Sequence, residues 1–280
     1  STGHLILTNA LLGLNSDSPV LDKNGEVILV RDSNSGQERP YTMAEAAYAY
    51  VIVIQAGAIA AVVILYWKTI WSICLGVFGQ STRARKLALT LIVAFCPAAI
   101  LGLLLDDIIE TALGNNVRAV ALALIVGAFV MLFVEYWRKQ RKAEESRERG
   151  LEELTIRQSL TIGILQCFAM WPGTSRSMAT IVGGYLVGLT PKKAAEFSFL
   201  LGLITLSAAS GYKLLSDGTQ MISALELKPV LLGCIVAFIS SALAIRWLVG
   251  FLSKYGLSFF AYYRIVLAVV VLFAASKEFL

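Results

Sequence analysis

The chain has 280 residues, of which 57% are hydrophobic and 15% are charged, and its mean hydropathy is +0.72. Soluble domains average about 45–50% apolar and about 25% charged residues, so this composition excludes an ordinary soluble domain and indicates a polytopic helical membrane protein. The net charge of +5 is assigned to cytoplasmic loops, and no nucleic-acid partner is expected because the sequence lacks a basic and aromatic binding surface.

The N-terminal segment is predicted to lie partly in the membrane. Residues 1–15 are too short to span it and are interpreted as the end of a re-entrant helix. Residues 16–42 are polar, with a short strand expected at residues 26–30.

Six apolar segments are long enough to cross a bilayer. They are residues 43–67, 87–105, 117–137, 194–212, 229–248 and 257–275. Pro97 is expected to kink the second span, and the following connection, residues 106–117, is acidic.

Residues 158–189 predict a second re-entrant element. This apolar stretch breaks at Pro172-Gly173, and each half is shorter than the about 20 residues that an upright span needs. A helix-turn-helix hairpin that enters the membrane and returns is therefore expected. Such irregular backbone is tolerated only where protein or a water-filled cavity surrounds it.

The distribution of Lys and Arg sets the orientation. The basic loops at residues 68–86, 138–157, 190–193 and 249–256 are placed in the cytoplasm. We therefore expect one all-α integral membrane domain over residues 1–280, with an inverted-topology repeat. Its halves are residues 1–137 and 158–280, joined by the cytoplasmic loop 138–157, and each half has a re-entrant hairpin and three spans.

Arg176 is the candidate functional residue of the hairpin. An arginine within a membrane segment is costly, so it needs a partner or a role. It follows the Pro172-Gly173 turn and is flanked by Ser175 and Ser177. A guanidinium fork, hydroxyls and the free N–H groups of a helix N-terminus together suit a phosphate. The alternative is that Arg176 pairs with a buried carboxylate while Ser175 and Ser177 cap the helix.

His4 is the only histidine of the chain and lies in Ser1-Thr2-Gly3-His4, another small turn before an apolar segment. In the inverted repeat this turn would meet the Arg176 turn, where imidazole could transfer a proton or attack phosphorus. A structural histidine is the alternative. A Cys/His zinc site is not expected, because the chain has one histidine and its four cysteines show no CxxC spacing.

The motif Trp171-Pro172-Gly173-Thr174-Ser175-Arg176-Ser177, with Thr180, resembles the PGxSRSxxT signature of bacterial undecaprenyl-diphosphate phosphatases of the bacitracin-resistance type. Gln166-Cys167 and residues 195–201 also resemble this family. Ser1–His4 resembles the end of its other motif, a Pro-x-Ser-Ser-Thr-Gly-His turn. The resemblance covers essentially the whole chain.

The resemblance implies a multi-pass hydrolase of the bacterial inner membrane that removes the terminal phosphate of a polyprenyl diphosphate. This recycles the lipid carrier for peptidoglycan and other envelope polymers, and it confers bacitracin resistance. Magnesium or calcium is the implied cofactor, and a homodimer is an expected assembly. The implied phosphate-binding residues are Arg176, Ser175, Ser177, Thr180 and Gly173, and the implied catalytic residues are His4, Arg176, Ser175 and Ser1. The attacking group stays open between His4, a serine and an activated water.

Two departures from the family pattern bear on activity. The acidic residues of the first motif, the expected metal ligands, would lie upstream of Ser1, so we expect an N-terminally truncated member that is inactive by itself. Met178 replaces a small residue and is expected to narrow the turn. The competing hypothesis is a lipid-phosphate transporter or flippase on the same scaffold. A purely structural membrane subunit would leave Arg176 unexplained.

Overall fold

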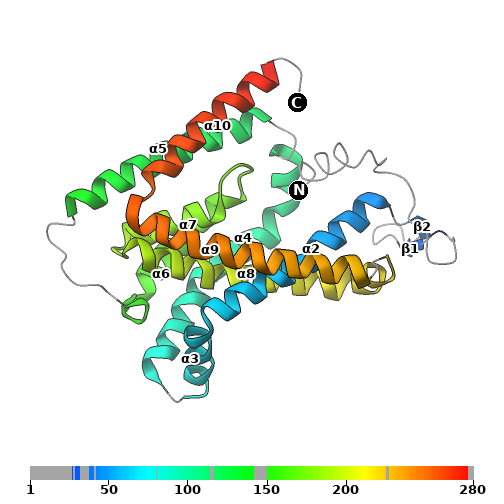
Figure 1. Cartoon of the computed structure of the whole chain (residues 1–280), viewed down its shortest axis with the longest axis horizontal. Coiled ribbons are helices and arrows are strands. Elements are labelled where there is room, and N and C mark those ends of the chain that lie inside the picture. The colour runs from blue at the N-terminus through cyan, green and yellow to red at the C-terminus, as the bar shows by residue number, and fades with distance from the viewer. Residues whose placement is uncertain are drawn as a thin grey trace. The chain divides into compact units, whose positions relative to one another are not determined.

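The computed structural model describes Val27 and residues 29–31, 38–40, 42–79, 81–113, 117–141, 150–224 and 227–276. Within these ranges the regular structure is almost entirely helical (Figure 1). The chain divides into two compact units. The first comprises Ser1–Leu65 and Leu206–Leu243, and the second comprises Tyr66–Thr205 and Ala244–Leu280.

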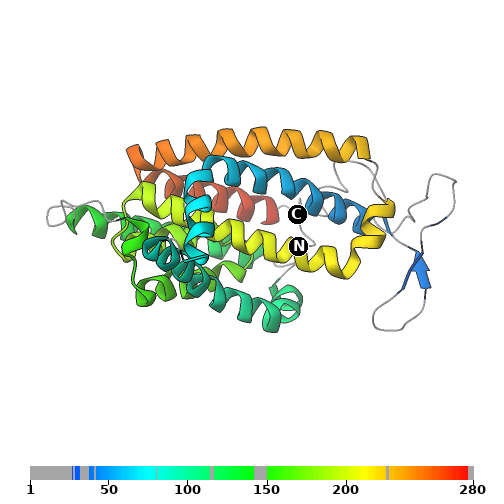
Figure 2. The same ribbon diagram turned by 90° about the horizontal axis from the view of Figure 1, so that it is seen from below.

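The first unit is built around helix α2, Met43–Leu65, and the first half of α9, Leu227–Tyr255. The two helices lie side by side (Figure 2), and the Tyr50 hydroxyl on α2 donates a hydrogen bond to the Pro229 carbonyl oxygen at 2.9 Å. A Cβ at Gly57 would collide with the carbonyl oxygen of Cys234. A glycine is therefore required there, as is common where membrane helices approach closely.

A short antiparallel sheet precedes α2. Strand β1, Leu29–Arg31, pairs with β2, Glu38–Pro40, so that Leu29 lies opposite Pro40. The strand expected at residues 26–30 is thus present, although its regular part begins three residues later.

The second unit holds most of the chain. Its complete elements are α3 (Trp67–Val77), α4 (Thr82–Leu113), α5 (Val117–Arg141), the 3₁₀ turn η1 (Leu151–Glu153), α6 (Ile156–Cys167), the 3₁₀ turn η2 (Phe168–Met170), α7 (Arg176–Leu186) and α10 (Ser258–Ser276). The start of α8 (Pro191–Ala224) and the end of α9 also belong to this unit. Helices α5 and α10 run side by side (Figure 1), α4 packs on α6, and α6 packs on α7.

The spans predicted from hydropathy are confirmed. Among the described residues, five helices are long and apolar enough to cross a membrane, and α2 with α3 makes a sixth if the pair, broken at Tyr66, is one span. These helices expose large apolar side chains, among them Leu103, Phe133 and Phe273. In water such surfaces would be unfavourable, whereas in a bilayer they face lipid. The chain is therefore a multi-pass membrane protein.

The helix-turn-helix form predicted for residues 158–189 is present, and its entry into the membrane stays a prediction. Helices α6 and α7 have 12 and 11 residues, so they measure about 18 and about 16 Å and neither crosses the hydrocarbon core of about 30 Å. Thr155 begins α6 through a reciprocal capping box with Gln158. At the end of α7, Gly188 takes a left-handed conformation with φ +91°. Gln158 Nε2 then donates to the Val187 carbonyl oxygen at 3.1 Å and joins the two ends of the hairpin.

Several predicted connections are shorter in the structure because their neighbouring helices continue. The acidic segment expected as a connection at residues 106–117 is mostly the end of α4, which reaches Leu113 and runs through Pro97 without a break. Helix α9 extends to Tyr255. Helices α5 and α6 enter both ends of the range 138–157. Charge alone does not end a helix, because each added residue still completes a backbone hydrogen bond. The inverted repeat stays a prediction.

Candidate active site around the Arg176 turn

The candidate residues of the second motif gather where α7 begins. Gly173 and Ser175 precede the helix, Arg176 and Ser177 form its first positions, and Thr180 lies one turn further on. His4 and Ser1, the catalytic candidates of the first motif, lie outside the described residues.

The turn itself requires glycine at position 173. Gly173 has φ +87°, a left-handed conformation that other residues adopt at a cost. A Cβ at this position would also lie 2.8 Å from the carbonyl oxygen of Val120 on α5. The Thr174 N–H donates to the Trp171 carbonyl oxygen at 3.0 Å, which closes the turn. Because it has no Cβ, Gly173 allows the backbone of the turn to pack against α5.

Ser175 caps α7, as the alternative interpretation anticipated. Its hydroxyl accepts a hydrogen bond from the Met178 N–H at 3.3 Å. The hydroxyls of Ser175 and Ser177 are 3.2 Å apart, Ser175 is exposed and Ser177 is partly exposed. A capped N-terminus with further free N–H groups and two adjacent hydroxyls is suited to bind an anion.

Arg176 does not pair with a carboxylate among the described residues. Its Nη1 donates to the Thr205 hydroxyl on α8, and Gly202, one turn earlier, leaves the space that the guanidinium fills, since a Cβ there would lie 2.7 Å from Nη2. The positive charge is held by neutral groups and remains available to an anionic ligand.

Thr180 ties α7 to α8. The residue is 1% exposed, and its hydroxyl lies 2.6 Å from that of Ser198 on α8. The same oxygen donates toward the carbonyl oxygens of Arg176 and Ser177, at 3.0 and 3.2 Å. The structure therefore shows Thr180 as a support behind the turn, and its predicted contact with phosphate stays a prediction.

Arg264 on α10 is part of this region and was not among the candidates from sequence. Its Nη2 donates to the Gly173 carbonyl oxygen at 2.9 Å. The signal that identifies Arg176, an arginine inside an apolar segment, is equally present at Arg264 within residues 257–275.

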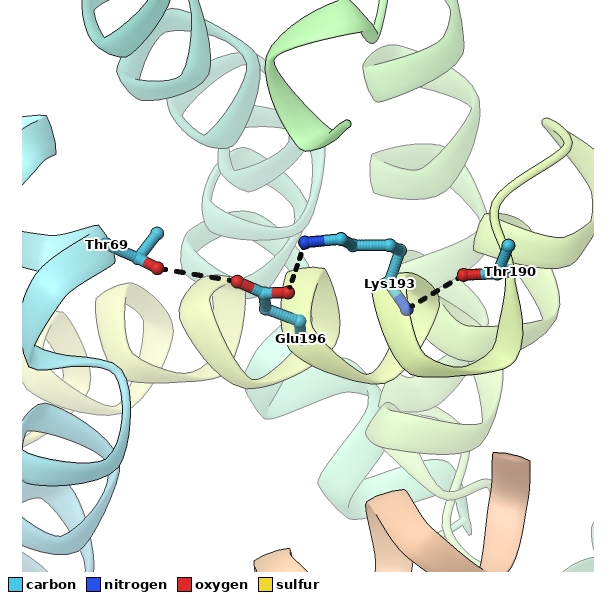
Figure 3. Close-up of polar contacts among 4 residues, drawn as sticks. All are labelled: Thr69, Thr190, Lys193 and Glu196. Atoms are coloured by element: carbon cyan, nitrogen blue, oxygen red, sulfur yellow. Dashed lines mark hydrogen bonds and ion pairs between the residues drawn. The ribbon is translucent and has the colours of Figure 1, made fainter. Parts of the chain in front are cut away.

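Glu196 belongs to a different polar cluster (Figure 3). Its carboxylate accepts hydrogen bonds from Lys193 Nζ at 2.9 Å and from the Thr69 hydroxyl at 3.4 Å. The Thr190 hydroxyl accepts from the Lys193 N–H at 3.4 Å and caps the start of α8. Thr69, Lys193 and Glu196, with Arg83 and Glu152, line a pocket of about 280 Å³. No residue of the Arg176 turn is among the residues that line it.

A metal ion finds no ligand set in the described part of the site. No group of three or more His, Cys, Asp or Glu side chains within the described ranges could hold one. A divalent cation in the reaction therefore stays a prediction.

Comparison with known proteins covers nearly the whole chain. The family model of the bacitracin resistance protein BacA matches residues 1–270. An undecaprenyl-diphosphatase of Polaromonas naphthalenivorans is 38% identical over 275 residues, which is 98% of this chain and 88% of that protein. The undecaprenyl-diphosphatase of Clostridium tetani is 36% identical over 275 residues, 98% of this chain and 89% of its own length.

Proposed function

Because the chain belongs to the bacitracin resistance protein BacA family, we propose that it is a membrane phosphatase that hydrolyses undecaprenyl diphosphate to undecaprenyl phosphate. In the net reaction one water is consumed, the bond between the terminal phosphorus and the bridging oxygen breaks, and inorganic phosphate is released. The product is the lipid carrier of peptidoglycan and envelope polymer synthesis, and its recycling accounts for bacitracin resistance.

One observation supports this proposal best. Arg176 lies at the N-terminus of the short helix α7, and its guanidinium has no carboxylate partner among the described residues. Phosphoryl transfer needs charge neutralisation on the non-bridging oxygens and exact placement of the reacting groups. The guanidinium supplies the first. The capped helix start and the paired hydroxyls of Ser175 and Ser177 supply further donors at the same place.

The first motif completes the proposal. His4 is assigned as the base or nucleophile, and Ser1 contributes a hydroxyl. Magnesium or calcium is proposed to support the reaction. Chelation with EDTA should then abolish phosphate release, and adding back either cation should restore it.

Residence in the bacterial inner membrane and assembly as a homodimer belong to the same proposal. The exposed apolar helix faces support a bilayer location. The mass of the purified protein in detergent tests the dimer.

The decisive assay measures release of inorganic phosphate from undecaprenyl diphosphate by the full-length protein. Arg176→Ala and His4→Ala should each abolish turnover. Arg157→Ala, at an exposed arginine of α6, should leave it unchanged and serves as the matched control. Full turnover by Arg176→Ala would disprove the assignment. Transfer of the lipid between leaflets without phosphate release would favour the transporter hypothesis.

A further inference from the structure

Arg264 is a second buried arginine at the back of the Arg176 turn. It lies on α10 and is 7% exposed. Its Nη2 donates to the carbonyl oxygens of Gly173 at 2.9 Å and of Ala123 at 3.2 Å, and its Nε donates to Leu124 at 3.4 Å. One side chain thus joins α10, α5 and the turn that precedes α7.

The contact with Gly173 fixes the orientation of a whole peptide group. The Gly173 C=O and the Thr174 N–H belong to one planar unit. Arg264 holds the carbonyl end, and the Trp171 carbonyl oxygen accepts from the N–H end at 3.0 Å. A peptide plane held at both ends cannot rotate, so the backbone that leads into Ser175 starts from a defined direction.

The other side of the turn is fixed to α5. The Trp171 indole Nε1 donates to the Ala119 carbonyl oxygen at 3.2 Å. Gly127, two turns further along α5, makes room for the arginine, because a Cβ there would lie 2.9 Å from Arg264 Nη2 and 3.0 Å from Met178 Cε. Gly127 thus leaves the space on α5 in which Arg264 reaches the Gly173 carbonyl oxygen.

The partners of Arg264 are neutral. The hydrogen bonds described for its guanidinium all go to backbone carbonyl oxygens, and no carboxylate among the described residues pairs with it. A buried cation with only neutral partners is expensive. A bound diphosphate next to the turn would offset part of that cost, since the guanidinium groups of Arg176 and Arg264 both lie at this turn without a carboxylate partner among the described residues.

We propose that Arg264 is a positioning residue for the phosphatase reaction, which holds the Gly173 carbonyl so that Arg176 and the start of α7 face the diphosphate. This inference rests on the proposed function. Arg264 acts through the turn and not as a group that touches the reacting atoms, so it differs from Arg176 in role although both are buried arginines.

The test compares Arg264→Ala, Arg264→Lys and the control Arg246→Ala in the full-length protein. Arg246 is an exposed arginine on α9 with no described contact to the turn. Three quantities are measured on each variant: kcat and KM with undecaprenyl diphosphate, the thermal midpoint in detergent, and hydrogen–deuterium exchange of the amides of residues 171–178.

Arg264→Ala should lower kcat about 100-fold, the loss expected when reacting groups are displaced by about 1 Å. KM should change little, because Arg264 lies behind the turn and is not proposed to contact the substrate. Amide exchange should rise in residues 171–178 and not along α5 or α10. Arg264→Lys, which keeps the charge and can still donate to a carbonyl, should recover part of both effects. Arg246→Ala should match the unaltered protein.

The outcomes separate the two proposals. If exchange in residues 171–178 does not change in Arg264→Ala, or if it rises equally throughout α5 and α10 with a lower thermal midpoint, the arginine is merely structural and the inference is overturned. Unaltered kcat in Arg264→Ala also overturns it. If the unaltered protein releases no phosphate, the proposed function fails, while a local rise in exchange would still establish that Arg264 holds the turn.

Discussion

The hydroxyls of Thr180 and Ser198 lie 2.6 Å apart and join α7 to α8 behind the Arg176 turn. Both residues are buried, with exposed fractions of 1% and 3%. The Ser198 hydroxyl has Thr180 as its described partner, whereas the Thr180 hydroxyl also lies within hydrogen-bond distance of the Arg176 and Ser177 carbonyl oxygens. The start of α7 is thus supported from α8 as well as from α5 and α10.

Thr180→Val should remove this contact at nearly constant volume. Because the Ser198 hydroxyl is left without its partner, the free energy of unfolding should fall by about 1–3 kcal/mol. Chemical or thermal unfolding in detergent measures the change. Thr161→Val removes an exposed hydroxyl that bonds only its own helix and should cost much less. The double variant with Ser198→Ala should cost less than the sum of the single variants, and strict additivity would show that the two hydroxyls are independent.

Gly173→Ala should impair both the fold of the turn and the reaction. The left-handed backbone alone costs about 1–2 kcal/mol for a residue with a Cβ, and that Cβ would meet the Val120 carbonyl oxygen at 2.8 Å. We expect phosphate release to fall about 100-fold through displacement of Arg176. Gly102→Ala on α4, where a Cβ meets nothing within 4 Å, is the control. Equal activity in the two variants would contradict a packed turn.

Arg176→Lys should show whether charge or geometry matters at this position. Lysine keeps the positive charge but lacks the planar fork that can bind two phosphate oxygens while one nitrogen bonds Thr205. A fall in kcat/KM of about 100-fold is expected, comparable to the loss of one donor to a developing negative charge. Arg157→Lys, at an exposed position, is the control. Activity close to that of the unaltered protein would mean that charge alone suffices.

Glu135→Gln should destabilise the second unit. This carboxylate on α5 is 1% exposed and accepts hydrogen bonds from Arg138 at 2.6 Å and from the Leu257 N–H, at the start of α10, at 3.1 Å. Loss of its charge should lower the free energy of unfolding by about 2 kcal/mol, since hydrogen bonds to charged groups are the stronger ones. Glu152→Gln, at a partly exposed glutamate with no described hydrogen bond, should have little effect. If both variants lost the same free energy of unfolding, the cost would come from the change in net charge and not from the hydrogen bonds of Glu135.

The parts of the fold that depend on local sequence could be predicted. Apolar length identified the spans, and the Pro172-Gly173 break placed the re-entrant turn within the hairpin, which α6 and α7 confirm. The lengths of the connections could not be predicted in the same way. The acidic residues after Leu105 predict a connection, yet α4 continues to Leu113, because a helix can extend beyond its apolar part when its backbone hydrogen bonds continue.

The partners of the site residues could not be predicted, because they are distant in sequence. Thr205 lies 29 residues after Arg176, and Arg264 lies 91 residues after Gly173. No spacing rule connects such pairs. The cost of an arginine in an apolar span applies to Arg264 as it does to Arg176, and the degree of burial in the structure distinguishes both from the exposed Arg246 in the span 229–248.

The hydrogen bond between Gln158 and the Val187 carbonyl closes the hairpin at its open end. Since α7 has 11 residues, the turn with Arg176 lies about 16 Å from that closure, which is about half of the hydrocarbon thickness. If that closure lies at the membrane surface, the diphosphate has to leave the headgroup layer and descend toward the middle of the bilayer to react. Lipid chain length then becomes a determinant of turnover, because a thicker bilayer lengthens that descent for every substrate molecule.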